Sequence, residues 1–305
     1  MTAFKTAAAA VAISLLAACG GGGGGGGNSS NEGPSGPNPG PVLDQIRSLT
    51  EAAPPAETAA DQDARSPSIV SRADSLLLSN VYAHTSSSDL PTFRLRASCS
   101  GTVCRLEERR LGYYDTISLS DLGIVSGNEQ PVGTKHGVTL IRDTGQHEGV
   151  DYRSLGAWMQ NAGFSVQVDR ETVEGVQINS RIGIVAGDLT GSPPAGGATW
   201  QGLMVGTPAE GTGRGDRLQG DATLTYSLAD QTMGATFTNI QNIDRLRAHS
   251  VSTVSFTDVL VKANGEFQAG LTGNHIQGGF YGPGHAEVAG IFEQQNIVGA
   301  FGAKR

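Results

Sequence analysis

The chain has few cysteines and few charged residues. Its 305 residues include 3 cysteines, and Asp, Glu, Lys and Arg together make up 16% of them. No two cysteines have the CxxC spacing of redox motifs, and three are too few for a four-thiolate zinc site. Acidic residues outnumber basic ones, which gives a net charge of −8 at pH 7. The chain lacks the basic surface that nucleic-acid binding needs, so we expect no nucleic-acid partner.

The signatures of common enzymes are absent as well. The sequence contains no GxSxG turn, no GxxxxGK[ST] phosphate loop and no HExxH zinc motif. Its carboxylates are scattered, and no pair has a spacing that nominates an acid and a base. Two imidazole–carboxylate pairs, His147-Glu148 and His285-x-Glu287, would form a metal site only if the fold joined them. We therefore predict a non-enzymatic protein with no cofactor and no metal ion.

The first residues have the pattern of an export signal. Lys5 precedes an apolar run, residues 7–18, that is shorter than the about 20 residues a spanning helix needs. Cys19 follows directly, and the stretch LAAC resembles the lipobox of bacterial lipoproteins, whose cysteine is lipidated after cleavage. The alternative is an ordinary secretory signal with an incidental cysteine. We expect residues 1–18 to be a lipoprotein signal peptide and Cys19 to carry the lipid, palmitate included. Gly20, in place of aspartate, favours the outer membrane.

Residues 19–41 have the composition of a flexible tether. Residues 20–27 are all glycine, and NSSNEGPSGPNPGP follows without a large apolar side chain. Such a segment buries too little surface to offset its ordering entropy, so it is expected to stay disordered. A Gly-rich coil of about 20 residues has an r.m.s. span of roughly 25 Å. The segment predicts a folded body that is displayed clear of the membrane.

The other two cysteines, Cys99 and Cys104, lie four residues apart around Gly101. A tight hairpin here would bring their Cα atoms within the range of a disulfide. Such a pair is expected to be oxidised in an exported protein. A redox or metal pair is the competing interpretation, and it lacks further ligands. We predict a structural disulfide.

Helical patterns are confined to the front of the remaining chain. Residues 42–53 place Val42, Ile46 and Leu49 on one face, and Ser66-Pro67 has the form of a helix start for residues 66–80. From about residue 90 the period changes to two, which is typical of strands. SPPAGG, residues 192–197, is the best internal boundary. We expect an N-terminal region, residues 42–194, with one or two short helices and several strands.

The period of two is strongest in residues 195–305. Trp200, Gly202, Met204 and Gly206 share one face. Ala222, Leu224, Tyr226 and Leu228 form an apolar face on the next segment. We count eight short strands with no helix between them, which favours an up-and-down antiparallel sheet over βαβ units. Eight strands are about the number at which such a sheet closes into a barrel with a filled interior.

Three short pieces near the C-terminus repeat one pattern. A β-branched residue, a glycine and a phenylalanine alternate in IQGGF, VAGIF and IVGAF, which start at residues 276, 288 and 297. A glycine inside a strand weakens it and needs a reason. Aromatic rings of neighbouring strands can lie on the bare glycine backbone where a barrel wall curls. We therefore interpret Gly290 and Gly299 as packing positions and not as a ligand loop.

GTGRGD, residues 211–216, is the other glycine-rich segment. It opens no helix, which argues against a phosphate loop. It contains Arg214-Gly215-Asp216, an adhesion-like tripeptide, although so short a motif often occurs by chance. We expect an exposed hairpin turn.

The C-terminus also carries a recognisable signature, which consists of Phe280, Tyr281, Gly282, Pro283, Glu287, Gly290, Phe292, Gly299 and Phe301. It resembles the closing signature of the transferrin-binding protein B-like β-barrel domain of Gram-negative surface lipoproteins. The segments ATWQGLMVG and GDATLTYSLA look like the opening strands of that domain. The lipobox and the tether also fit the family.

The resemblance implies a mainly β fold. It has a C-terminal eight-stranded antiparallel β-barrel, residues 195–305, behind a smaller, partly β, handle-like N-terminal region. It also implies a role in display and binding. Large members carry two handle-plus-barrel lobes, whereas this chain has material for one. Their host-binding residues match no positions here, so the ligand-binding residues stay unassigned.

We therefore expect a non-enzymatic lipoprotein anchored in the outer membrane and exposed at the surface. It would bind a protein or solute, with iron or metal acquisition as a candidate role. The alternative is a structural or adhesive lipoprotein without a dedicated ligand.

Overall fold

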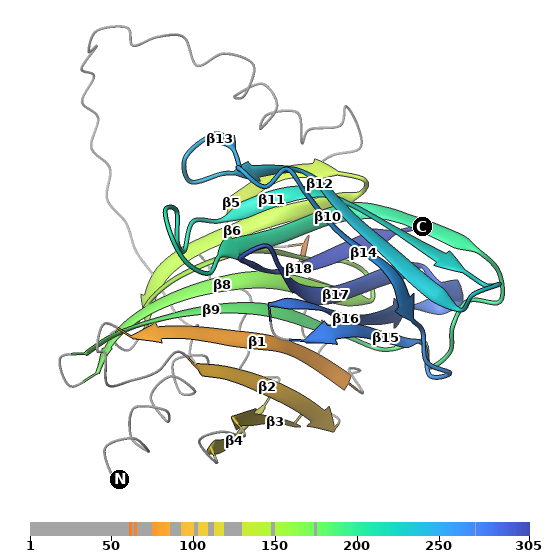
Figure 1. Cartoon of the computed structure of the whole chain (residues 1–305), viewed down its shortest axis with the longest axis horizontal. Helices are drawn as coiled ribbons and strands as arrows, with labels where there is room; N and C mark the ends of the chain where they lie inside the picture. Colours follow the sequence, from red (N-terminus) through yellow and green to blue (C-terminus); the bar gives the residue numbers. More distant parts are fainter. Residues whose placement is uncertain are drawn as a thin grey trace, which may run out of the picture.

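The described part of the chain is almost entirely β. A computed structural model describes residues 61–62, 64–65, 75–85, 93–100, 103–108, 113–118, 130–147, 150–173, 176–271 and 273–305. They form two nine-stranded antiparallel sheets, here the N-terminal and the C-terminal sheet (Figure 1). The signal peptide, the tether, Cys19 and the helix predicted at residues 42–53 lie outside the described residues. No helix in the described ranges is long and apolar enough to cross a membrane.

The N-terminal sheet has the strand order β4-β3-β2-β1-β9-β8-β7-β6-β5. Most of its strands pair antiparallel with the next strand along the chain. Its strands are β1 (Ser75–Thr85), β2 (Phe93–Ser100), β3 (Val103–Glu108), β4 (Tyr113–Ser118), β5 (Gln130–Lys135), β6 (Val138–His147), β7 (Val150–Trp158), β8 (Ala162–Val173) and β9 (Val176–Gly187).

The C-terminal sheet begins after the predicted boundary at residues 192–197. The strands are β10 (Ala198–Pro208), β11 (Leu218–Ser227), β12 (Thr232–Asn242), β13 (Arg247–Ala248), β14 (Thr253–Leu260), β15 (Glu266–Leu271), β16 (Asn274–Tyr281), β17 (Glu287–Gln294) and β18 (Ile297–Lys304). Apart from the two-residue β13, they are the eight strands that the sequence predicts. A 3₁₀ turn, Pro283–His285, links β16 to β17.

The C-terminal sheet curls, and its first and last strands along the chain, β10 and β18, pair in the middle of the sheet. The strands at its open edges are β14 and β15, so the sheet does not close into a barrel (Figure 1). In the described residues β14 and β15 form no ladder with each other, and one isolated bridge, Val261 with Phe267, lies at the connection between them. The backbone is irregular in both strands, since Asp258 in β14 and Gly270 in β15 have φ of 56° and 78°. The eight strands that the sequence predicts are therefore present, but the prediction that they form a closed barrel is wrong.

The inside of the curled sheet is filled with side chains. Phe280 lies at the centre of one group of rings, 5.3 Å from Trp200 and 5.9 Å from Tyr226 between centroids. Phe237 lies at the centre of a second, 4.6 Å from Phe292 and 5.2 Å from Phe301. All five of these phenylalanine and tryptophan side chains are at most 2% exposed. Ring pairs at these distances add to the burial of their surface.

The repeated glycines lie under these rings. Gly278 is paired across the sheet with Phe267, Gly290 with Phe301, and Gly299 with Phe292. A Cβ added to Gly290 would meet Cζ of Phe301 at 2.6 Å, and one added to Gly299 would meet Cζ of Phe292 at the same distance. The packing that the sequence predicts for these glycines is therefore present.

A second core lies between the two sheets. Leu203 and Val205 of β10 and Ala289 and Ile291 of β17 point outward from the C-terminal sheet and contact residues such as Phe164 of β8. The strands β10, β17 and β18 are therefore buried on both faces along most of their length. Burial on both faces explains why these strands have nearly continuous apolar sequences instead of a polar alternate face.

Glu287, one of the signature residues, joins the sheets at one end. Its carboxylate accepts backbone N–H groups from Gln160 and Asn161 at 2.9 Å and from Ala162 at 3.0 Å, in the turn between β7 and β8. Burial raises the pKa of Glu287, and this effect outweighs the three hydrogen bonds and the nearby charge of Lys304, which lower it.

Two details of the sequence interpretation are wrong. The helix predicted for residues 66–80 does not extend over its second half, because residues 75–80 belong to β1. Leu76 and Leu77 there pair with Ala186 and Val185 of β9, so sheet pairing overrides local helix propensity. Leu228 is 47% exposed, because β11 ends at Ser227 and Leu228 lies in the following turn.

Candidate functional site

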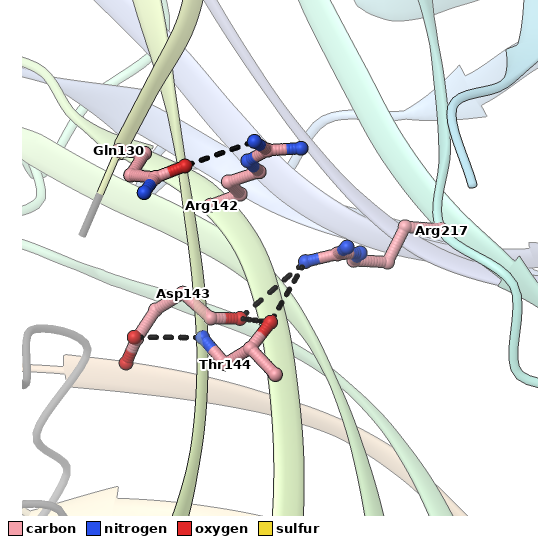
Figure 2. Close-up of a pocket in the computed structure, with 5 residues that line it drawn as sticks. All are labelled: Gln130, Arg142, Asp143, Thr144 and Arg217. Carbon is pink, nitrogen blue, oxygen red and sulfur yellow. Dashed lines mark hydrogen bonds between the residues drawn. The ribbon is translucent and has the colours of Figure 1, made fainter. Parts of the chain in front are cut away.

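A polar pocket lies where the N-terminal sheet meets the start of β11. It encloses about 350 Å³ and is lined by Gln130, Arg142, Asp143, Thr144 and Arg217 (Figure 2). We call it the junction pocket. Gln130 belongs to β5, the next three residues to β6, and Arg217 directly precedes β11. The inside of the C-terminal sheet is filled with side chains, whereas this pocket lies outside that core.

Arg217 is held rigidly by Asp244. Its Nη2 donates to Asp244 Oδ1 at 2.7 Å, its Nε to the same oxygen at 3.1 Å, and its backbone N–H to Oδ2 at 2.8 Å. The two side chains are 8% and 16% exposed. Burial raises the pKa of Asp244, but the hydrogen bonds from Arg217 and the charges of Arg217 and Arg153 outweigh it and hold that pKa below 3.8. Asp244 therefore stays ionised and fixes the guanidinium in place.

The remaining nitrogen of Arg217, Nη1, faces the junction pocket with weak partners. It lies 3.4 Å from each of three acceptors, the carbonyl oxygens of Asp143 and Ser154 and the hydroxyl of Thr144. N–H···O bonds are normally 2.7–3.2 Å long, so the N–H groups of Nη1 form only weak hydrogen bonds here. Arg217 thus presents charged N–H groups that a better acceptor would satisfy.

Arg142 supplies the second guanidinium of the pocket. Its Nη2 donates to Gln130 Oε1 at 2.9 Å, and the side chain is otherwise exposed. The carboxylate of Asp143 accepts the backbone N–H of Thr144 at 2.7 Å, and Figure 2 draws it turned away from both guanidinium groups. Among the lining residues none is a nucleophile beside a base, so the arrangement is suited to binding and not to bond cleavage.

The adhesion-like tripeptide lies beside this site, in the connection from β10 to β11. Arg214 is exposed, but the Asp216 carboxylate forms an ion pair with Arg245 and accepts Asn242 Nδ2 at 2.8 Å. An adhesive aspartate must offer its carboxylate to a partner. Because Asp216 is already bound within the protein, the segment acts here as a structural turn.

Of the two histidine–carboxylate pairs, the structure describes the side chains of His285 and Glu287 only, and it does not join these two into a metal site. His285 Nε2 lies 2.9 Å from the backbone oxygen of Ser192, and Glu287 is bound to the turn after β7. The side chain of His147 and all of Glu148 lie outside the described residues. Within the ranges that are described, no group of three or more His, Cys, Asp or Glu residues could hold a metal ion.

The two later cysteines lie opposite each other. The register of β2 and β3 makes Cys99 and Cys104 partners across the antiparallel pair. Opposed residues of such a pair have Cα atoms about 4.5–5.5 Å apart, which is within the range of a disulfide. Their side chains are not described, so the disulfide stays a prediction that this register supports.

The signature residues occupy structural positions. Phe280, Phe292 and Phe301 fill the inside of the C-terminal sheet, and Tyr281 lies in the core between the sheets. Burial raises the pKa of Tyr281 far above its usual value, and Glu266 adds to this shift. Gly282 has a φ of 75°, which favours glycine and allows the chain to turn into Pro283.

Sequence reasoning missed the residues of the junction pocket. Arg142 and Arg217 are 75 positions apart, as the difference 217 − 142 shows, and neither belongs to a motif. Only the packing of β6 against the end of the C-terminal sheet brings them together, so no local signal was available.

Comparison with known proteins finds a family that the C-terminal sheet resembles. Residues 193–305 match the family of the C-lobe and N-lobe β-barrels of transferrin-binding protein B. No curated protein matches the chain.

Solved structures similar to this chain include transferrin-binding proteins and a lactoferrin-binding protein. A double mutant of transferrin-binding protein B from Haemophilus parasuis Hp5 is 13% identical, with a TM-score of 0.36, and the alignment covers 70% of this chain and 54% of that one. The isotype 1 protein from serogroup B Neisseria meningitidis is 16% identical, with a TM-score of 0.36 and coverages of 75% and 43%. The N-lobe domain of lactoferrin-binding protein B from Moraxella bovis is 11% identical, with a TM-score of 0.33 and coverages of 76% and 99%.

This chain therefore spans about half the length of the transferrin-binding proteins that it matches. The family match begins within the linker at residues 192–197 and runs to the last residue, so it includes every strand from β10 to β18. Residues 193–305 are thus similar to the β-barrel domains of transferrin-binding protein B, as the C-terminal sequence signature predicts.

Proposed function

We propose that this protein is a non-enzymatic binding protein of the cell surface whose partner is an extracellular protein. Iron carriers are the first candidates, because the similar solved structures are those of transferrin-binding and lactoferrin-binding proteins. In this proposal Cys19 carries the lipid anchor in the outer membrane, residues 19–41 are the tether, and residues 42–194 and 195–305 are the handle-like region and the curled β domain.

The filled inside of the C-terminal sheet is the observation that carries the proposal. Rings such as Phe237, Phe267 and Phe280 pack there with at most 1% exposure. A binding site for a small solute needs a cavity that buries most of the ligand, and this interior offers none among the described residues. Binding is therefore assigned to the outer surface, where β5, β6 and the residue before β11 line the junction pocket.

Direct binding measurements test the proposal. The full chain, immobilised through its N-terminus, would be exposed to transferrin, lactoferrin and other protein iron carriers, and binding followed by surface plasmon resonance. We expect saturable binding to at least one of them. Failure to bind any of them across a range of pH and salt would refute the assignment to iron carriers.

The anchor has its own test. Cells that express the full chain would be labelled with radioactive palmitate, and the Cys19→Ala variant would serve as the comparison. We expect label in the wild-type protein, surface exposure to added protease, and loss of both in the variant. Equal labelling of the two proteins would contradict the lipid site.

A further inference from the structure

We infer that the junction pocket binds a carboxylate between Arg142 and Arg217, and that an acidic side chain of the partner protein supplies it. This inference rests on the proposed function, because it names the chemistry by which the partner is held. The guanidinium group has a fork of N–H donors that matches the two oxygens of a carboxylate, which lysine cannot imitate.

The pocket has the size of a side-chain site. Its volume of about 350 Å³ lies near the lower end of ligand pockets, which usually measure about 300–1,000 Å³. A glutamate or aspartate side chain fits such a space, whereas a large cofactor does not. The walls come from both sheets, so the pocket exists only in the assembled fold.

Arg217 is arranged in advance for this ligand. Asp244 holds Nε and Nη2, so the guanidinium keeps its orientation without a ligand. The nitrogen that is left, Nη1, has three acceptors at the long distance of 3.4 Å. A carboxylate oxygen at a normal hydrogen-bond distance would replace weak bonds and would not require Arg217 to move.

Arg142 provides the charge that a ligand would neutralise. Its described hydrogen-bond partner, Gln130, is neutral, and no carboxylate lies within the 4.0 Å of an ion pair in the described part of the chain. Arg217, by contrast, is balanced by Asp244. One guanidinium without an opposite charge favours a ligand with a single negative charge.

The net charge of the two guanidinium groups limits the charge of the ligand. Arg217 is balanced by Asp244, so a ligand would neutralise the charge of Arg142 alone. A carboxylate supplies that single negative charge, whereas a phosphate dianion would leave a negative charge in excess. This balance favours a carboxylate over a phosphate.

NMR of the full chain, labelled with ¹⁵N-arginine, tests the inference through the Nε–H signals. The probes are acetate, the peptides Gly-Glu-Gly and Gly-Gln-Gly with acetylated N-termini and amidated C-termini, and inorganic phosphate. We expect acetate and Gly-Glu-Gly to shift the signals of Arg142 and Arg217 saturably, and Gly-Gln-Gly to leave them unchanged. Unchanged signals with both carboxylates, or stronger binding of phosphate, would overturn the carboxylate assignment.

Matched variants locate the site. Arg142→Gln should weaken the binding of Gly-Glu-Gly by about tenfold or more, since a hydrogen bond to a charged group contributes about that much. Arg142→Lys keeps the positive charge but loses the forked pair of N–H donors, so it should keep only part of the wild-type affinity for Gly-Glu-Gly. Arg170→Gln removes an exposed arginine of β8 and should bind like wild type. Equal loss in the Arg142 and Arg170 variants would refute the pocket as the site.

Binding measurements with the partner protein itself show whether one of its side chains supplies the carboxylate. If an iron carrier binds wild type and binds Arg142→Gln equally well, the partner does not use the pocket, and the inference fails while the proposed function stands. If carboxylates bind the pocket and no carrier binds the chain, the proposed carrier fails while the carboxylate site stands. Binding of acetate without binding of Gly-Glu-Gly would refute a partner side chain and assign a free small carboxylate.

Discussion

Replacing Gly290 by valine tests the packing of the C-terminal sheet most directly. Gly290 lies in β17, opposite Phe301 of β18 and Gly278 of β16. A Cβ at this position would meet Cζ of Phe301 at 2.6 Å, the Cα of Gly278 at 2.9 Å and, closer still, the backbone oxygen of Gln277. Real Cβ atoms do not approach other atoms so closely, so the backbone must shift.

The expected cost follows from which atoms must move. Overfilling a packed core usually costs about 1–3 kcal/mol. Two of the three atoms that a Cβ would meet belong to the backbone of β16, which is held in its ladder with β17 and cannot turn aside as a flexible side chain could. We therefore expect Gly290→Val to lower the free energy of unfolding by about 3 kcal/mol, near the upper end of that range.

Gly234→Val is the matched control. Gly234 lies in β12 of the same sheet, and a Cβ there would have its nearest neighbours, two backbone oxygens, at 3.9 Å. This variant should change stability by no more than about 0.5 kcal/mol, because valine suits a strand with open space beside it.

Urea and thermal unfolding, followed by circular dichroism, measure both variants. A double variant, Gly290→Ala with Phe301→Leu, would relieve the contact with the ring but not the contact with the backbone, so it should recover only part of the loss seen in Gly290→Ala. Equal stability of the two valine variants would refute the glycine–aromatic account.

Three further predictions concern single contacts. Glu287→Ala leaves three backbone N–H groups of the turn after β7 without their acceptor, so the free energy of unfolding should fall by about 1–3 kcal/mol. An unchanged urea midpoint would contradict this role of Glu287. The pKa of Asp244 lies below 3.8 in the folded state, so its pairing with Arg217 stabilises the protein above pH 3.8 and is lost as the pH falls through the folded pKa. Asp244→Asn should therefore lose more stability at pH 6 than near pH 2, which urea titrations across that range would show. Mass spectrometry of the exported chain, digested without reductant, should find Cys99 and Cys104 joined, and free thiols at both would refute the disulfide.

The strands were largely predictable because strand formation leaves a local mark. Alternation in residues 195–305 identifies all eight long strands, since side chains on a strand point to opposite faces in turn. The errors came from tertiary pairing. Leu76 and Leu77 lie in a segment with a helical start signal, yet their partners in β9 hold them in a sheet. The open seam between β14 and β15 also escaped prediction, because alternation shows that a segment is a strand and does not show which strands pair.

The candidate site was not predictable in the same way. The histidines and the tripeptide at residues 214–216 attracted notice as motifs, but the fold binds Asp216 within the protein and assembles no histidine cluster among the described residues. Arg142, Arg217 and Asp244 carry no signal in the sequence, and their importance comes from their positions around one pocket.

The sequence by itself determined the β nature of the chain, the resemblance of its C-terminal part to the transferrin-binding protein B barrels and the packing of phenylalanines on glycines. These features repeat every two residues or form a short motif, so each is encoded by residues that lie close together in the sequence. Tertiary structure alone decided that β10, β17 and β18 are buried on both faces, that Glu287 joins the two sheets, and that Arg142 meets Arg217. Each of these depends on the docking of one sheet against the other, and that contact involves residues far apart in the chain whose pairing no local pattern encodes.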